Sequence, residues 1–273
     1  MKTSTAKLIL IALFGLGFAT ELQADAAAAK SHLVTVDAKP EPIAIDPAKT
    51  AVIVVDMQND FGAKGGMFDR AGIDISAIRS AIGPTAKALA AARTAGMKII
   101  YLKMAFRPDL SDLGAPDSPS ARSAKRLGFG DTIHAPDGRE GRILIRDTWN
   151  TDILPELKPQ PDDVVIYKHR YSGFYETDLD ATLKKLGIKD LIITGCTTSV
   201  CVEATVRDAM YRDYRCVALT DCMNQPKLGK SLPGSNHDAS LVLIEGSFGW
   251  VSRSDQFIKA LEGQSVAAAK QRP

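Results

Sequence analysis

The stretch Leu191-Ile192-Ile193-Thr194-Gly195-Cys196-Thr197-Thr198-Ser199-Val200-Cys201-Val202-Glu203 decides the fold of this 273-residue chain. Its apolar half reads as a buried strand that ends at Gly195, and a helix is expected from Val200 onward after a short polar turn. The Cys201 thiol would then lie at a helix start, where unpaired N–H groups and the helix dipole favour a thiolate. The alternative is a small buried cysteine that packs the helix onto a sheet.

The same alternation of strands and helices runs along the rest of the chain. The predicted strands are 51–55, 97–102, 164–167, 190–194, 216–220 and 250–251, and the predicted helices are 75–95, 179–186, 200–212 and 238–245. Residues 104–161 are rich in Pro, Gly and charge, so we expect loops and short helices at the rim of a site. The pattern predicts an α/β fold with a doubly wound parallel sheet, a Rossmann-like three-layer α/β/α arrangement.

The first residues have the pattern of a secretory signal. Lys2 and Lys7 precede the apolar run 8–19, and Ala24-Asp25-Ala26 supplies a small-x-small cleavage pattern. We therefore predict a signal peptide at 1–26 and export to the periplasm or the medium, with an uncleaved anchor as the alternative. The other predicted segments are an N-terminal lead-in at 27–45, loosely ordered up to residue 39, one catalytic domain at 46–262 and a disordered tail at 263–273.

Composition and charge argue against nucleic acid and the membrane as partners of this chain. Charged residues make up 24% of the chain and the net charge is only +2, which argues against a nucleic-acid surface. The small basic cluster of Arg122, Lys125 and Arg126 is expected to be a solvated helix face. No segment after the signal is apolar enough for a membrane span. A disulfide between Cys196 and Cys222, both at predicted strand ends, stays open at this stage.

Three reactive side chains follow predicted strands. Asp56 ends the first strand, Lys168 ends the third and Cys201 follows the fourth. The carboxyl ends of parallel strands meet at one edge of the sheet, where ligands bind in such folds. Each residue alone has a structural explanation, but all three at one edge predict a catalytic site.

These residues resemble the motifs of the isochorismatase-like cysteine hydrolases. The matching signatures are Val54-Val55-Asp56-Met57-Gln58-Asn59 and Thr197-Thr198-Ser199-Val200-Cys201-Val202-Glu203, with Lys168 between them. The segments Gly65-Gly66-Met67, Arg170-Tyr171-Ser172-Gly173-Phe174 and Phe248-Gly249-Trp250-Val251-Ser252 are most similar to the ureidoacrylate amidohydrolase branch. The resemblance implies a catalytic triad of Asp56, Lys168 and Cys201, an oxyanion hole from the N–H groups of Thr197 and Cys201, a cis peptide before Thr197, no cofactor and a homo-oligomer.

Departures from the family pattern narrow the expected chemistry. Family members that bind a metal carry histidines just beyond the second strand, whereas residues 103–109 contain none, so no metal site is expected. Met104 stands where the ureidoacrylate branch is expected to have a polar amide, and this favours a different small amide or ureide as substrate. The expected substrate-binding residues are Gln58, Phe106, Tyr171 and Phe174. His169 is a less favoured base, because adjacent strand residues face opposite ways and it cannot share the direction of Lys168.

The residues therefore predict a metal-free hydrolase that cleaves a C–N bond of a small amide, ureide or carbamoyl compound through a Cys201 acyl-enzyme, with release of ammonia or an amine. One alternative is vinyl ether hydrolysis, the isochorismatase reaction, for which family members lack this cysteine. The other is an exported binding protein without activity, against which all three triad residues argue.

Overall fold

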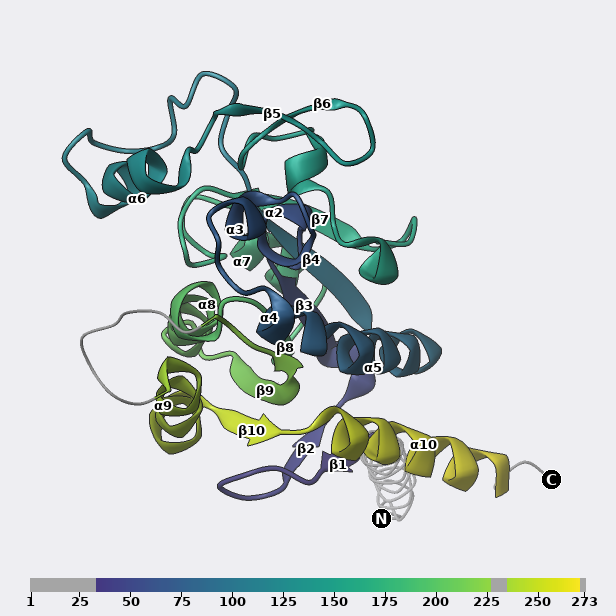
Figure 1. Ribbon diagram of the computed structural model, residues 1–273. Coiled ribbons are helices and arrows are strands. Elements are labelled where there is room, and N and C mark those ends of the chain that lie inside the picture. Colours follow the sequence, from purple (N-terminus) through teal and green to yellow (C-terminus); the bar gives the residue numbers. More distant parts are fainter. Residues whose placement is uncertain (1–32, 227–234, 271–273) are drawn as a thin grey trace, which may run out of the picture.

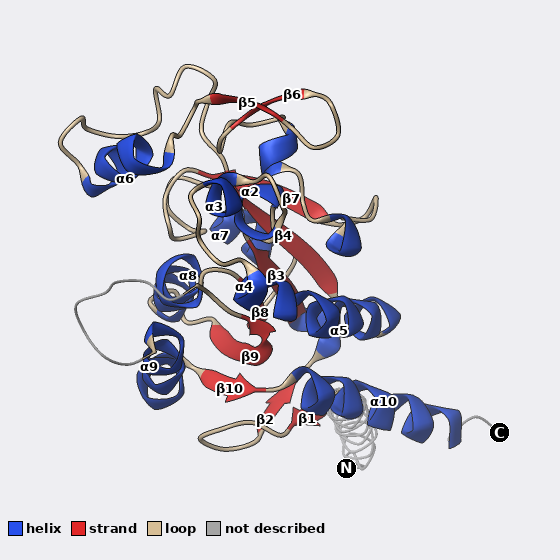
Figure 2. Ribbon diagram, in the orientation of Figure 1, coloured by secondary structure: helices blue, strands red, loops and turns tan. Residues whose placement is uncertain are grey.

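The computed structural model describes residues 33–226 and 235–270, and its centre is a six-stranded parallel sheet (Figures 1 and 2). The strand order is β10-β9-β8-β3-β4-β7. The strands are β3 (Thr50–Val55), β4 (Lys98–Met104), β7 (Val164–Lys168), β8 (Asp190–Gly195), β9 (Arg215–Met223) and β10 (Trp250–Ser252). This confirms the predicted α/β fold and all six predicted strands. The predicted signal peptide lies outside the described residues.

Two hydrophobic layers cover the two faces of this sheet because strand side chains alternate in direction. Val52 and Val54 belong to the layer that includes residues of α5 (Ile82–Thr94) and α10 (Ser254–Lys270). Ile53 and Val55 belong to the opposite layer, with residues of α7 (Leu179–Lys185) and α8 (Glu203–Met210). Both faces of the central strand are therefore buried, which explains its uninterrupted apolar sequence.

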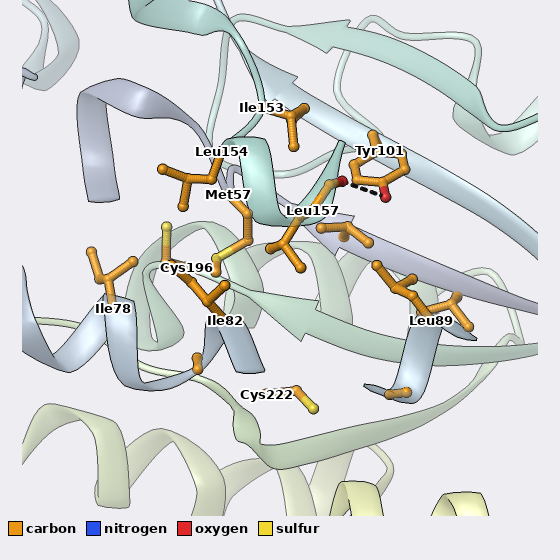
Figure 3. Packing of buried hydrophobic residues seen from close by; sticks show 14 of the residues in the cluster. Met57, Ile78, Ile82, Leu89, Tyr101, Ile153, Leu154, Leu157, Cys196 and Cys222 are labelled. Carbon is orange, nitrogen blue, oxygen red and sulfur yellow. Dashed lines mark hydrogen bonds between the residues drawn. The ribbon is translucent and has the colours of Figure 1, made fainter. Parts of the chain in front are cut away.

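Figure 3 shows part of the hydrophobic layer on the α5 side of the sheet. Met57, Ile78, Leu154 and Cys196 pack there beside one another, and Tyr101 donates a hydrogen bond of 2.8 Å to the Leu157 carbonyl. Among the described residues all four cysteines, Cys196, Cys201, Cys216 and Cys222, are free and buried. The disulfide that the sequence left open is thus absent from this part of the chain.

A rim of short elements stands beyond the carboxyl ends of the strands (Figure 1). It comprises α2 (Asn59–Gly62), α3 (Met67–Arg70), α6 (Pro119–Leu127), β5 (Thr132–His134), β6 (Glu140–Arg142) and η2 (Trp149–Thr151). The 3-10 turn η3 (Pro155–Leu157) packs against α5 instead. The prediction of loops and short elements at 104–161 is confirmed for this segment. Ser118 caps α6 by accepting a hydrogen bond from Ala121, and Gly128 ends it in the left-handed conformation.

Several helix predictions need correction. The helix expected at 75–95 is divided into α4 (Ser76–Ser80) and α5, with Ala81 at the junction. The helix expected from Val200 begins instead with a π-helical turn, η4 (Thr198–Val202). The helix expected at 238–245 becomes α9 (Asn236–Leu243), followed by a second π-helical turn, η5 (Ile244–Phe248).

The two ends of the domain also differ from expectation. From Leu33 onward the lead-in is ordered: β1 (Val34–Val36) and β2 (Ile43–Ile45) pair antiparallel, and η1 (Pro47–Lys49) leads into β3. The alternating residues Val36 and Ile45 are fully buried, so this hairpin belongs to the core. α10 was not predicted, and it extends into the segment expected to be a disordered tail. No helix in the described ranges is long and apolar enough to span a membrane.

Candidate active site

Asp56 is held rigidly where β3 ends. Its backbone is in the left-handed region with φ of 52°, and its N–H donates to the Leu102 carbonyl at 2.9 Å. Its Oδ1 accepts a hydrogen bond of 2.9 Å from the Met104 N–H. The Gln58 Oε1 accepts from the same N–H at 2.8 Å, and the Gln58 amide donates to the Met104 carbonyl at 3.1 Å. These bonds fix the carboxylate between β3 and β4.

Lys168 meets this carboxylate from β7. Its Nζ lies 2.7 Å from Asp56 Oδ2, and neither side chain is more than 1% exposed. The ammonium also donates to the Arg170 carbonyl at 3.2 Å. Since a buried ion pair needs further hydrogen bonds to offset desolvation, these contacts are what allow both charges to remain there.

Cys201 completes the group from η4. Its thiol lies beside this ion pair, since the Asp56 carboxylate and the Lys168 ammonium both shift its pKa. The turn before it is unusually close to β3, because a Cβ on Gly195 would lie 2.0 Å from the Val55 carbonyl oxygen. The peptide between Cys196 and Thr197 is cis, as the resemblance implied. The structure therefore brings Asp56, Lys168 and Cys201 together.

The ionisation of the thiol differs from the sequence prediction. Burial raises the pKa of Cys201 to about 12, and the adjacent Asp56 adds to the shift although Lys168 opposes it. Burial likewise raises the pKa of Asp56 against the lowering effect of Lys168. Burial alone would lower the pKa of Lys168, but the charges of Asp56 and Cys201 outweigh it and leave that pKa raised. Desolvation thus outweighs the helix start and Lys168, and the direction of this pKa shift is opposite to the one expected from the sequence.

A cavity of about 130 Å³ opens onto Cys201. Thr197, which precedes η4, lines it together with Val200 and Cys201 of η4 and Met104 of β4. Tyr171, one of the predicted substrate-binding residues, also lines it and is 44% exposed. The cavity gives a small molecule access to the thiol.

The other predicted binding residues lie elsewhere. Gln58 is fully buried and orients Met104 and Asp56. Phe106 is fully buried and stacks on Phe129 at 5.5 Å between ring centroids, so Phe129 and not Phe106 faces the cavity. Phe174 stacks on Tyr214 at 5.9 Å in the opposite core layer. The expectation that Phe106 and Phe174 contact substrate is corrected, since strand and loop directions turn them into the core.

His169 does not reach the thiol. Its Nε2 lies 3.1 Å from Glu176, and its ring meets Tyr175 edge to face. It lines a separate hollow that does not include Cys201 or Lys168. The alternation argument against His169 as the base is consistent with this position.

Sequence reasoning missed the buried Asp60. Its carboxylate accepts hydrogen bonds from the N–H groups of Met67 at 2.9 Å and Leu144 at 2.7 Å, and from the Asn150 amide at 2.6 Å. Met67 and Leu144 both line the cavity, so Asp60 joins two of its walls. The only signal in the sequence was a second acidic residue four positions after Asp56.

The described ranges hold no group of three or more His, Cys, Asp or Glu side chains arranged to bind a metal ion. The site chemistry available in this part of the chain is therefore that of a thiol, a carboxylate and an ammonium. The absence of a metal requirement stays a prediction.

Comparison with known proteins identifies the family. Residues 50–256 match the isochorismatase domain, so this chain belongs to the isochorismatase family. The ureidoacrylate amidohydrolase RutB of Methylobacterium radiotolerans is 40% identical over 236 residues, which cover 86% of this chain and 88% of that protein. The RutB of Variovorax paradoxus is 40% identical over 223 residues, covering 82% and 85%. The family and the branch predicted from the motifs are confirmed.

A solved structure supports the same assignment. A cysteine hydrolase from Pseudomonas syringae pv. phaseolicola superimposes with a TM-score of 0.68 at 30% identity, covering 81% of this chain and 95% of that one. The likeness thus extends over nearly all of the described domain.

Proposed function

We propose that this protein hydrolyses a carbon–nitrogen bond of a small amide, ureide or carbamoyl compound with Cys201 as nucleophile. The predicted enzyme class, a hydrolase acting on C–N bonds, is confirmed by the family and by the amidohydrolase relatives. The covalent step and the roles of single residues are our inference from the geometry. The buried Asp56–Lys168 ion pair beside a thiol that lines a cavity carries the proposal.

In the first half-reaction the Cys201 sulfur attacks the carbonyl carbon while its proton passes to Asp56. The raised pKa of Asp56 makes this carboxylate a better base than an exposed one. The tetrahedral oxyanion is stabilised by the N–H groups of Thr197 and Cys201. The C–N bond then breaks, and Asp56 returns the proton to the departing nitrogen, which leaves as ammonia or an amine.

In the second half-reaction water attacks the thioester carbon and gives a proton to Asp56. The S–C bond breaks, the acid is released and the Cys201 thiol regains its proton. Lys168 keeps its charge throughout, stabilising the carboxylate and the transient thiolate. The raised thiol pKa fits this scheme, because the thiolate forms only when the base is engaged.

The test is ammonia release from a panel of small amides and ureides by the wild type, Cys201→Ala and Cys216→Ala. We expect Cys201→Ala to lose at least about a thousandfold in kcat/KM while retaining a cooperative melt. Cys216 is buried in the core and does not line the cavity, so Cys216→Ala should retain turnover. Mass spectrometry after a rapid acid quench should find an acyl adduct on the Cys201 peptide. Substantial turnover by Cys201→Ala would refute the covalent mechanism.

We also infer that the protein is exported after removal of residues 1–26, which rests on the N-terminal sequence alone. Cell fractionation followed by N-terminal mass analysis tests this. A cytoplasmic protein that retains Met1 and Lys2 would contradict it. The homo-oligomer implied by the resemblance stays a prediction that light scattering can decide.

A further inference from the structure

The side chain of Gln225 reaches the turn that carries Cys201. Gln225 follows the end of β9 by two residues and is only 6% exposed. Its Oε1 accepts a hydrogen bond of 2.6 Å from the Ser199 N–H. Ser199 lies in η4 midway between Thr197 and Cys201, and the N–H groups of these two residues are the oxyanion donors proposed above. One buried side chain from a neighbouring strand is therefore bound to the middle of this turn.

The hydrogen bond from Ser199 caps η4. The first N–H groups of a helix have no acceptor within the helix, and the side chain of Thr197, the residue before η4, accepts none of them. Gln225 supplies an acceptor instead, at one peptide unit of the turn. Without this acceptor a partly buried N–H would lose its partner, and the peptide units of the turn would be held less firmly.

The backbone beside Gln225 is anchored to the strand that leads into the turn. The Gln225 N–H donates to Asn224 Oδ1 at 2.9 Å, and the Asn224 N–H donates to the Gly195 carbonyl at 3.3 Å. Gly195 is the last residue of β8, from which the chain enters η4. The backbone of residues 224–225 thus holds the strand end while the Gln225 side chain holds the turn.

A second contact supports the turn through a side chain. Thr198 Oγ1 lies 2.9 Å from His237 Nδ1 of α9, and Thr198 is fully buried. Figure 1 shows α9 next to α8, the helix that continues η4. This contact involves a hydroxyl, whereas Gln225 binds a peptide N–H. Gln225 is therefore the better placed of the two to control the orientation of the peptide units.

Gln225 acts through Ser199 and not on the substrate, because neither residue lines the cavity that opens onto Cys201. Resting on the function proposed above, we propose that Gln225 is a positioning residue that holds the N–H groups of Thr197 and Cys201 in the orientation required by the oxyanion. Such donors act mainly in the transition state, where the charge on the oxygen develops. Loss of Gln225 should therefore lower kcat and leave KM almost unchanged.

Two substitutions of Gln225 test this kinetic prediction. Gln225→Met has a similar side-chain length but no strong acceptor, so kcat should fall by about 10- to 100-fold with KM within about threefold of the wild type. Gln225→Glu retains an acceptor oxygen at the same distance from the backbone, and its kcat should recover to within about fivefold of the wild type.

Thr85→Val is the matched control. Thr85 is fully buried and donates to the Cys222 carbonyl in β9. The variant removes one buried hydrogen bond to the same strand and leaves the bond between Gln225 and Ser199 in place. Thermal melts should show that Thr85→Val and Gln225→Met are both destabilised, whereas kcat of Thr85→Val should stay within about twofold of the wild type.

Hydrogen exchange followed by mass spectrometry tests the positioning role without turnover. In Gln225→Met the amides of residues 196–202 should exchange at least about threefold faster than in the wild type, and Thr85→Val should leave their exchange unchanged. An active Cys201→Ala would refute the covalent mechanism, but faster exchange in Gln225→Met would still support the hold on the turn. Unchanged exchange in Gln225→Met, a loss confined to KM, or no recovery in Gln225→Glu would overturn the proposal.

Discussion

Asp56 Oδ2 and Lys168 Nζ lie 2.7 Å apart although their strands, β3 and β7, are separated in the sheet by β4. The strand between them supplies the bond that orients the pair, since the Met104 N–H donates to Asp56. The left-handed backbone at Asp56 turns its carboxylate across β4 toward Lys168. A charged pair is thus built into the sheet edge beside Cys201.

Removing one partner of this pair should destabilise the fold. Lys168→Met leaves a buried carboxylate without its counter-charge, so we expect a loss of about 3–5 kcal/mol in the free energy of unfolding. The double variant Asp56→Asn/Lys168→Met should lose less than the sum of the two single losses. Urea denaturation of the four proteins measures this coupling, and additive losses would show that the two charges do not interact.

The reactivity of Cys201 should follow its raised pKa. Iodoacetamide should modify Cys201 first, because it alone among the four cysteines lines the cavity. The pKa of the Cys201 thiol is about 12. Its labelling rate should therefore continue to increase as the pH rises above ~8.5, the pKa of a free cysteine. Lys168→Met should slow labelling further at a given pH. A labelling midpoint below pH 8, or first modification at Cys216 or Cys222, would contradict this result.

Asp60 should make stability depend on pH. Burial raises its pKa to about 6, above the ~3.9 of an unfolded chain. The group then contributes stability that is complete below about pH 4 and is lost as the pH rises toward 6. The unfolding free energy of the wild type minus that of Asp60→Asn should therefore fall across this range and stay level above it.

Asp69→Asn is the matched control for Asp60. The pKa of Asp69 is lowered by hydrogen bonds from the Gly65 N–H and Lys64. The contribution of Asp69 to stability should therefore be lost as the pH falls. The unfolding free energy of the wild type minus that of Asp69→Asn should rise with pH, opposite to the slope for Asp60. The slope of the Asp69 difference lies below about pH 4, so urea denaturation between about pH 2 and 8 gives both curves. A difference for Asp60 that rises with pH would contradict the raised pKa.

Gly195 should be intolerant of a side chain. A Cβ there would meet the Val55 backbone at 2.0 Å, and its φ of +120° disfavours other residues. We expect Gly195→Ala to cost at least about 3 kcal/mol and to shift η4, with loss of activity. Gly263→Ala, at an exposed position of helix α10 with no atom near the added methyl, should be neutral or stabilising by up to about 1 kcal/mol. Equal thermal melts of Gly195→Ala and the wild type would refute the close approach.

The sequence by itself determined the parallel sheet and the three residues at its edge. Strands such as β3 and β8 are buried on both faces, so their apolar runs mark them without knowledge of any neighbour. Asp56, Lys168 and Cys201 could be grouped because parallel strands place their carboxyl ends together. The alternation of directions along β7 likewise separated Lys168 from His169.

Only the tertiary structure decided the ionisation and the walls of the site. The pKa of Cys201 depends on desolvation by residues far away in the chain, which outweighs the local effect of a helix start. Phe106 and Phe129 are both aromatic, and only their packing places one in the core and the other at the cavity. Arg126 and Lys125 are adjacent and chemically alike, yet the orientation of α6 brings only Arg126 to the cavity. Burial and side-chain direction are properties of the assembled fold, so local sequence patterns do not contain them.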